Sequence, residues 1–144
     1  MENQGVEYMN LNRFAGRWKT VGRIFQTELT PEIKINGTDT YEWLPGNFFL
    51  LHIADVLVGD EKNYTLEIIG FDKLLAQYTM QYYDNYGDSG FMVAAVDKDT
   101  WTFVGGSLRF KGGFSNNDLE FSGIWEQSAD GDEWEEFMEI KLSK

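Results

Sequence analysis

The feature that most constrains this chain is an alternation of apolar and polar residues with a period of two, interrupted by turn-forming clusters about every ten positions. Such alternation is typical of antiparallel strands that bury one face. The turn clusters are rich in Asn, Asp and Gly, which tolerate the backbone conformations of tight hairpins. We therefore predict strands at residues 16–26, 35–44, 47–57, 62–72, 75–85, 90–97, 100–105, 107–114, 119–127 and 133–142.

The predicted strands follow one another without intervening helical patterns, and none contains a proline. Only residues 10–15 have helical spacing, with Leu11 and Phe14 three positions apart behind Asn10 as a cap. Strands joined by short hairpins favour an up-and-down sheet, and closure into a barrel removes its exposed edges. We therefore predict an all-β fold for residues 1–144, a single antiparallel barrel of about ten strands with a short N-terminal helix that closes one end.

The alternation also predicts which side chains face the barrel interior. One register carries most of the aromatic residues, including all five tryptophans, and the opposite register carries most of the charged ones, with Arg23, Glu67 and Arg109 among them. We expect the aromatic register to face inward. On the strand at 62–72 this prediction places Tyr64, Leu66 and Ile68 inside.

The segment 48–56 departs from this pattern because it is apolar on both registers. Phe49, Leu51 and Ile53 would form an outer apolar surface that something must cover. The opening helix or a second subunit could do so, and we keep a homodimer as one of the two arrangements.

Composition excludes several classes of function. The chain has no cysteine and a single histidine, which excludes thiol chemistry, Cys-ligated metals and His-rich metal sites, so we predict no metal and no cofactor. Its formal net charge of -12 disfavours nucleic acid and anionic membranes as partners. The polar start and the lack of a long apolar run predict a cytoplasmic protein.

Gly16-Arg17-Trp18, at the start of the first predicted strand, resembles the Gly-x-Trp opening of the calycin-type barrels, which include lipocalins and fatty-acid-binding proteins. In those families the tryptophan closes the barrel base beneath a basic side chain from near the last strand, for which Lys141 is the nearest candidate. Tyr41-Glu42-Trp43, the stretch 67–72 and the ending from Gly123 to Trp134 resemble a lipocalin-like family of small bacterial proteins with no assigned function. The resemblance implies a barrel fold but no particular activity or ligand.

An aromatic interior can be a filled core or a cavity for a flat apolar ligand, and composition does not separate the two. We predict a cavity, with His52 and Glu136 orienting the ligand. The wall of the predicted cavity is made of Tyr41, Trp43, Tyr82, Trp101, Phe110, Phe121 and Trp125.

His52 is the most informative single residue because it is the only histidine and lies in an otherwise apolar strand. Three roles remain open for it: a hydrogen-bonded core residue, a ligand contact, or a haem ligand or acid–base group. Glu136 lies on the apolar register, where a carboxylate needs a partner or a proton, and Asp39 has the same ambiguity.

We therefore predict a barrel that binds a small hydrophobic or aromatic molecule without transforming it, and we identify no catalytic residue. Two alternatives remain. One is an acid–base enzyme, an isomerase, lyase or hydrolase, that uses His52 with Glu136 or Asp39. The other is an interaction module whose core is filled and whose outer apolar surface is functional.

Overall fold

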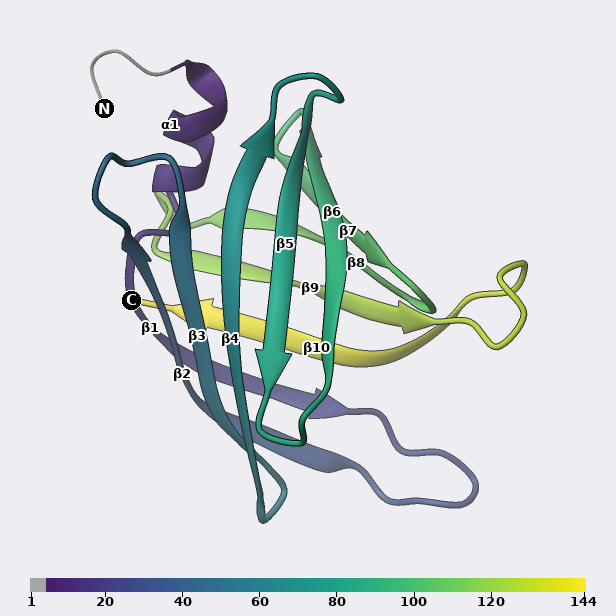
Figure 1. Cartoon of the computed structure of the whole chain (residues 1–144). Helices are drawn as coiled ribbons and strands as arrows, with labels where there is room; N and C mark the ends of the chain where they lie inside the picture. Colours follow the sequence, from purple (N-terminus) through teal and green to yellow (C-terminus); the bar gives the residue numbers. More distant parts are fainter. Residues whose placement is uncertain (1–4) are drawn as a thin grey trace.

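The computed structural model describes residues 5–144 and shows a closed barrel of ten antiparallel strands preceded by one short helix (Figure 1). Each strand pairs with the next one along the chain, and β1 closes the barrel against β10. The predicted all-β up-and-down barrel is therefore confirmed. Its elements are α1 (Val6–Asn12), β1 (Gly16–Ile24), β2 (Ile33–Trp43), β3 (Leu50–Val58), β4 (Glu61–Asp72), β5 (Gln77–Asp84), β6 (Ser89–Asp97), β7 (Thr100–Gly105), β8 (Leu108–Ser115), β9 (Glu120–Gln127) and β10 (Glu135–Ser143).

The helix differs from its prediction in position. It runs over Val6–Asn12, four residues earlier than predicted at its start, and Gly5 rather than Asn10 occupies the N-cap position. The spacing of Leu11 and Phe14 reflects the last turn of the helix and the turn that follows it. Within residues 5–144, no helix is long and apolar enough to cross a membrane.

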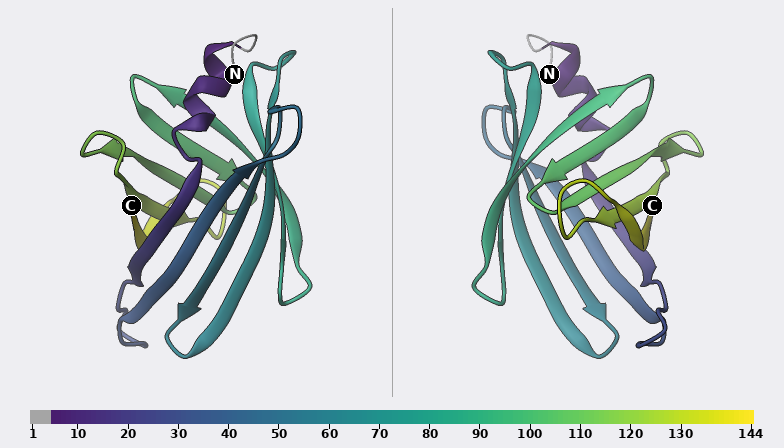
Figure 2. Two further views of the ribbon diagram at one scale, coloured as in Figure 1. Left: turned by 90° about the vertical axis from the view of Figure 1, so that its left-hand side faces the viewer. Right: turned by 90° about the vertical axis from the view of Figure 1, so that its right-hand side faces the viewer.

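α1 lies over one end of the barrel, as predicted (Figure 2). Leu11 and Phe14 are buried against the barrel, and the fully buried Trp18 donates a hydrogen bond from Nε1 to the Phe14 carbonyl oxygen at 2.7 Å. The basic side chain over Trp18 belongs to Lys144, whose Nζ lies 4.6 Å from the ring centroid. Lys141, the expected candidate, instead forms an ion pair with Glu120, because its register points outward.

A pair of facing glycines allows an aromatic side chain to lie across two strands. Gly112 of β8 and Gly123 of β9 are directly opposite each other, and the Phe110 ring occupies the space where their side chains would be. A Cβ on Gly123 would lie 2.4 Å from both the Phe110 ring and the Lys111 carbonyl oxygen. These positions therefore require glycine for close approach.

The expected inward register is correct on most strands and wrong on β4. Glu67, predicted to face solvent, is only 6% exposed and lines the barrel interior. Leu66 and Ile68, predicted to point inward, lie on the outer register with Tyr64. Polarity is thus reversed over residues 63–68, with polar groups inside and apolar groups outside, whereas Ile69 farther along the strand is apolar and inward.

The helix α1 contacts the segment before β3 at Phe48, on the inward register of Leu50, rather than on the outer apolar surface of Phe49, Leu51 and Ile53. Tyr8 of the helix packs edge-on against Phe48, with ring centroids 5.6 Å apart. Phe49 lies over the backbone of Gly70 and remains 52% exposed. The homodimer that would cover the outer surface stays a prediction.

Candidate functional site

The barrel encloses a cavity of about 700 Å³. At the helix end it is closed by Leu11 and Phe14, and at the opposite end it reaches Val58, Asp84 and Ser107 beside the hairpin turns. No helix of the described chain crosses that second end (Figure 2). A cavity of this size is typical of sites for small molecules.

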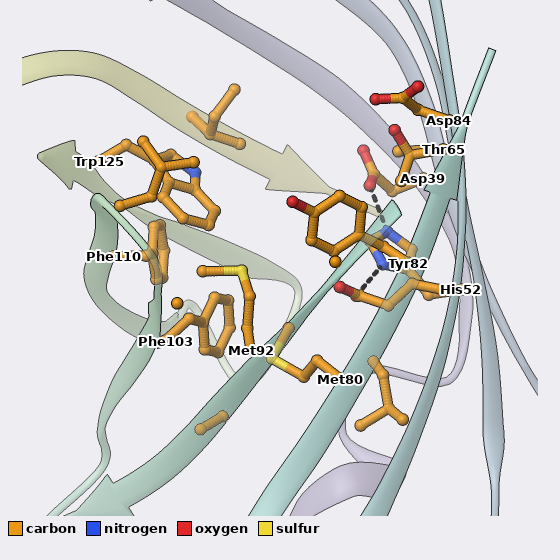
Figure 3. Close-up of a pocket in the computed structure, with 18 of the residues that line it drawn as sticks. Asp39, His52, Thr65, Met80, Tyr82, Asp84, Met92, Phe103, Phe110 and Trp125 are labelled. Carbon is orange, nitrogen blue, oxygen red and sulfur yellow. Dashed lines mark hydrogen bonds and ion pairs between the residues drawn. The ribbon is translucent and has the colours of Figure 1, made fainter. Parts of the chain in front are cut away.

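The two sides of the cavity differ in chemistry (Figure 3). One side is aromatic and sulfur-rich, and its rings pack together, as in the stack of Phe103 on Phe110 with centroids 4.7 Å apart. The polar side chains of the other side come from β2 to β5. The apolar side includes Met80, Met92, Phe103, Phe110, Phe121 and Trp125, and the polar side includes Asp39, His52, Thr65, Glu67, Tyr82 and Asp84.

A carboxylate–imidazole–carboxylate group forms the centre of the polar side. His52 Nε2 lies 2.6 Å from Asp39 Oδ2, and His52 Nδ1 lies 2.9 Å from Glu67 Oε1. The hydroxyl of Thr20 donates a hydrogen bond to the other oxygen of Asp39. All three titratable side chains are at least 85% buried, so the group lies in a largely desolvated environment.

Strand register brings these residues together. Tyr41, His52, Glu67 and Tyr82 are direct partners across β2, β3, β4 and β5, so they form one inward row. The next inward row lies two residues away on each strand and consists of Asp39, Ala54, Thr65 and Asp84. Side chains directly opposite each other on antiparallel strands lie within contact distance, which brings Glu67 to His52, and Asp39 reaches His52 diagonally from the neighbouring row.

The charge of His52 is set by its two partners. Burial lowers the pKa of His52, but the hydrogen bonds and charges of Asp39 and Glu67 outweigh that effect and raise the pKa to about 9. The imidazole is therefore protonated near neutral pH. Tyr41 stacks on it with ring centroids 4.0 Å apart, and burial together with the two carboxylates raises the pKa of Tyr41 well above its usual value.

This geometry does not suit His52 as a haem ligand or as a general base. Both ring nitrogens are engaged by carboxylates, so neither is directed at an axial position of a haem. A protonated imidazole is also not a general base. Among residues 5–144, no group of histidine and carboxylate side chains is arranged to hold a metal ion.

Most of the predicted site residues line the cavity. Its lining includes Tyr41, His52, Tyr82, Trp101, Phe110, Phe121 and Trp125. Asp39, considered as a partner of His52, contacts it directly. The inward face of the barrel therefore brings together side chains from six strands, β2, β3, β5, β7, β8 and β9.

Two predicted site residues lie elsewhere. Trp43 is outside the cavity lining, and its Nε1 donates to Asn12 Oδ1 at 2.8 Å, which ties the end of β2 to the helix. Glu136 is exposed on the barrel exterior because a bulge between Glu136 and Met138 shifts the register of β10. Trp134 is also outside, where the Arg109 guanidinium covers its ring at 4.2 Å.

Glu67 is the main site residue that the alternation missed, because its apolar neighbours mark the outer face of β4. A local signal for it exists in the sequence. Gly59-Asp60 makes a two-residue hairpin loop that pairs Val58 with Glu61, and counting back along both strands places His52 opposite Glu67. An inward His52 therefore implies an inward Glu67.

Comparison with known proteins supports the fold and gives no activity. A family model described as "Protein of unknown function (DUF1579)" matches residues 4–107, more than half of the chain. The crystal structure of Rv2717c from M. tuberculosis is similar, with a TM-score of 0.68 over 99% of both chains and 10% sequence identity. No curated protein matches the sequence. The structural likeness therefore concerns the barrel alone.

Proposed function

The chain belongs to the DUF1579 family of proteins of unknown function, and we propose from its site that it binds a small apolar or aromatic molecule inside the barrel, without transforming it. The observation that carries this proposal is the cavity of about 700 Å³ with one aromatic side and one hydrogen-bonded polar side. Ligand sites commonly combine a mostly apolar lining with a few placed polar groups.

The apolar side supplies the contact area for the ligand. Phe103, Phe110 and Trp125 pack against one another, which holds their rings in place before any ligand arrives. A preformed wall reduces the entropy that is lost on binding. The polar side is also preformed, because His52 is fixed by a carboxylate on each ring nitrogen.

Filling the cavity tests this proposal. Ala54 lines the cavity between Asp39 and Thr65, whereas Ala95 is exposed on the outer face of β6. We expect Ala54→Phe to weaken binding of the neutral dye N-phenyl-naphthylamine by about tenfold or more, because the new ring occupies ligand space. Ala95→Phe is the matched control and should bind the dye like the wild type.

Dye fluorescence titration, with circular dichroism to verify folding, provides the measurement. Equal dye binding by the wild type and by folded Ala54→Phe would place the dye outside the cavity and contradict the proposal. Absence of dye binding by the wild type would also contradict it, since a preformed apolar cavity of this size should accept a flat neutral probe.

A further inference from the structure

The charges around the cavity are unevenly distributed. Asp39, Glu67 and Asp84 all line it, and the only cationic side chain in the lining of the described chain is His52. Three carboxylates facing one imidazolium leave this side of the cavity negative. The arginines stay outside, as predicted: Arg23 pairs with Glu139, and Arg109 pairs with Glu126.

Glu67 has capacity for a further partner. Its side chain is 8% exposed and lines the cavity, and Oε1 accepts a hydrogen bond from His52. Within residues 5–144, the hydrogen bond of the Glu67 side chain is made by Oε1 and leaves Oε2 without a donor. A carboxylate oxygen that is accessible in a largely desolvated cavity is a favourable acceptor for a charged donor.

Asp84 extends this negative side toward the open end of the barrel. It lies opposite Thr65 on β4, and its Oδ1 accepts hydrogen bonds from the backbone N–H groups of Tyr86 and Asp88. Those bonds fix the orientation of the carboxylate beside the path into the cavity. An approaching cation would thus meet Asp84 before it reaches Glu67.

We propose that the ligand is a monocationic amine with an aromatic or otherwise apolar body, its ammonium group directed at Glu67 and Asp39 and its body against Phe103, Phe110 and Trp125. This inference rests on the proposed function and adds the ligand class to it. An ammonium donates charge-assisted hydrogen bonds to carboxylates, which are stronger in a desolvated cavity than in water. A carboxylate ligand, such as a fatty acid, would meet like charge without a lysine or arginine to offset it.

The test compares three probes that share one body and differ in charge: naphthyl-ethylamine, naphthyl-ethanol and naphthyl-acetate. Titration calorimetry near neutral pH should show the amine binding about tenfold tighter than the alcohol, and the acetate weakest. Glu67→Gln should weaken amine binding by about tenfold and change alcohol binding little. Glu42→Gln removes the same charge from an exposed position on β2 and should have no effect.

Asp84→Asn provides a second variant in case Glu67→Gln fails to fold. Its amide oxygen can keep the bonds to the turn, and we expect amine affinity to fall several-fold. Alcohol or acetate binding as tight as that of the amine would overturn the ligand class and leave the proposed function standing. If none of the three probes nor the neutral dye binds, both proposals are wrong.

Discussion

The protonation state of His52 provides a quantitative test of the site. Its pKa is about 9 in the folded protein and 6.5 in the unfolded chain, and one pKa unit corresponds to about 1.4 kcal/mol. The raised pKa therefore contributes about 3 kcal/mol to the free energy of unfolding. Because the folded state binds the proton more tightly, this stabilisation is fully present below pH 6.5 and is lost as the pH rises through 9.

Since His52 is the only histidine, its ring signals in proton–nitrogen NMR spectra of untagged protein need no assignment among alternatives. We expect both ring nitrogens to remain protonated at neutral pH and to titrate with a midpoint near 9. Urea unfolding should show most of the 3 kcal/mol lost between pH 6.5 and pH 9 in the wild type, and the loss should be absent in His52→Gln. An NMR midpoint at or below 6.5 would refute the ion-paired description of the site.

Two further changes test the packing around the site by denaturant unfolding. Thr20→Val keeps the side-chain shape but removes the buried donor to Asp39, and should cost roughly 1–3 kcal/mol; an unchanged free energy of unfolding would show that this bond is dispensable. Gly123→Ala should cost roughly 1–3 kcal/mol because its Cβ would collide with the Phe110 ring and the Lys111 carbonyl oxygen, and a neutral result would mean that β8 and β9 separate easily.

The fold could be predicted from the sequence because its determinants are local. Alternation and turn residues specify strands and hairpins, and every predicted strand is present with ends within three residues of those observed. Closure follows from the need to pair the first and last strands. The position of α1 was harder to predict from the sequence, because Gly5 offers no side-chain cap and the helix starts in a polar segment.

The site was only partly predictable because it depends on a local reversal of polarity. The rule that apolar residues face inward selected the aromatic wall apart from Trp43 and wrongly placed Glu67 outside. Over residues 63–68 of β4 the inward side chains are polar and the outward ones are apolar, so the alternation there indicates the wrong face. The predicted inward position of Glu136 was wrong for a different reason. A bulge shifts the alternation within β10, and the residue types of the strand do not reveal it.

The central claim is that the barrel interior holds a small molecule, and native mass spectrometry of freshly purified protein tests it most directly. We expect a fraction of the wild-type protein to carry an added mass that denaturation removes, and we expect Ala54→Phe to lack it. The released compound should be an amine with an apolar body. An added mass retained in equal amount by folded Ala54→Phe, or a wild-type protein that stays free of ligand and binds none of the probes, would contradict the account.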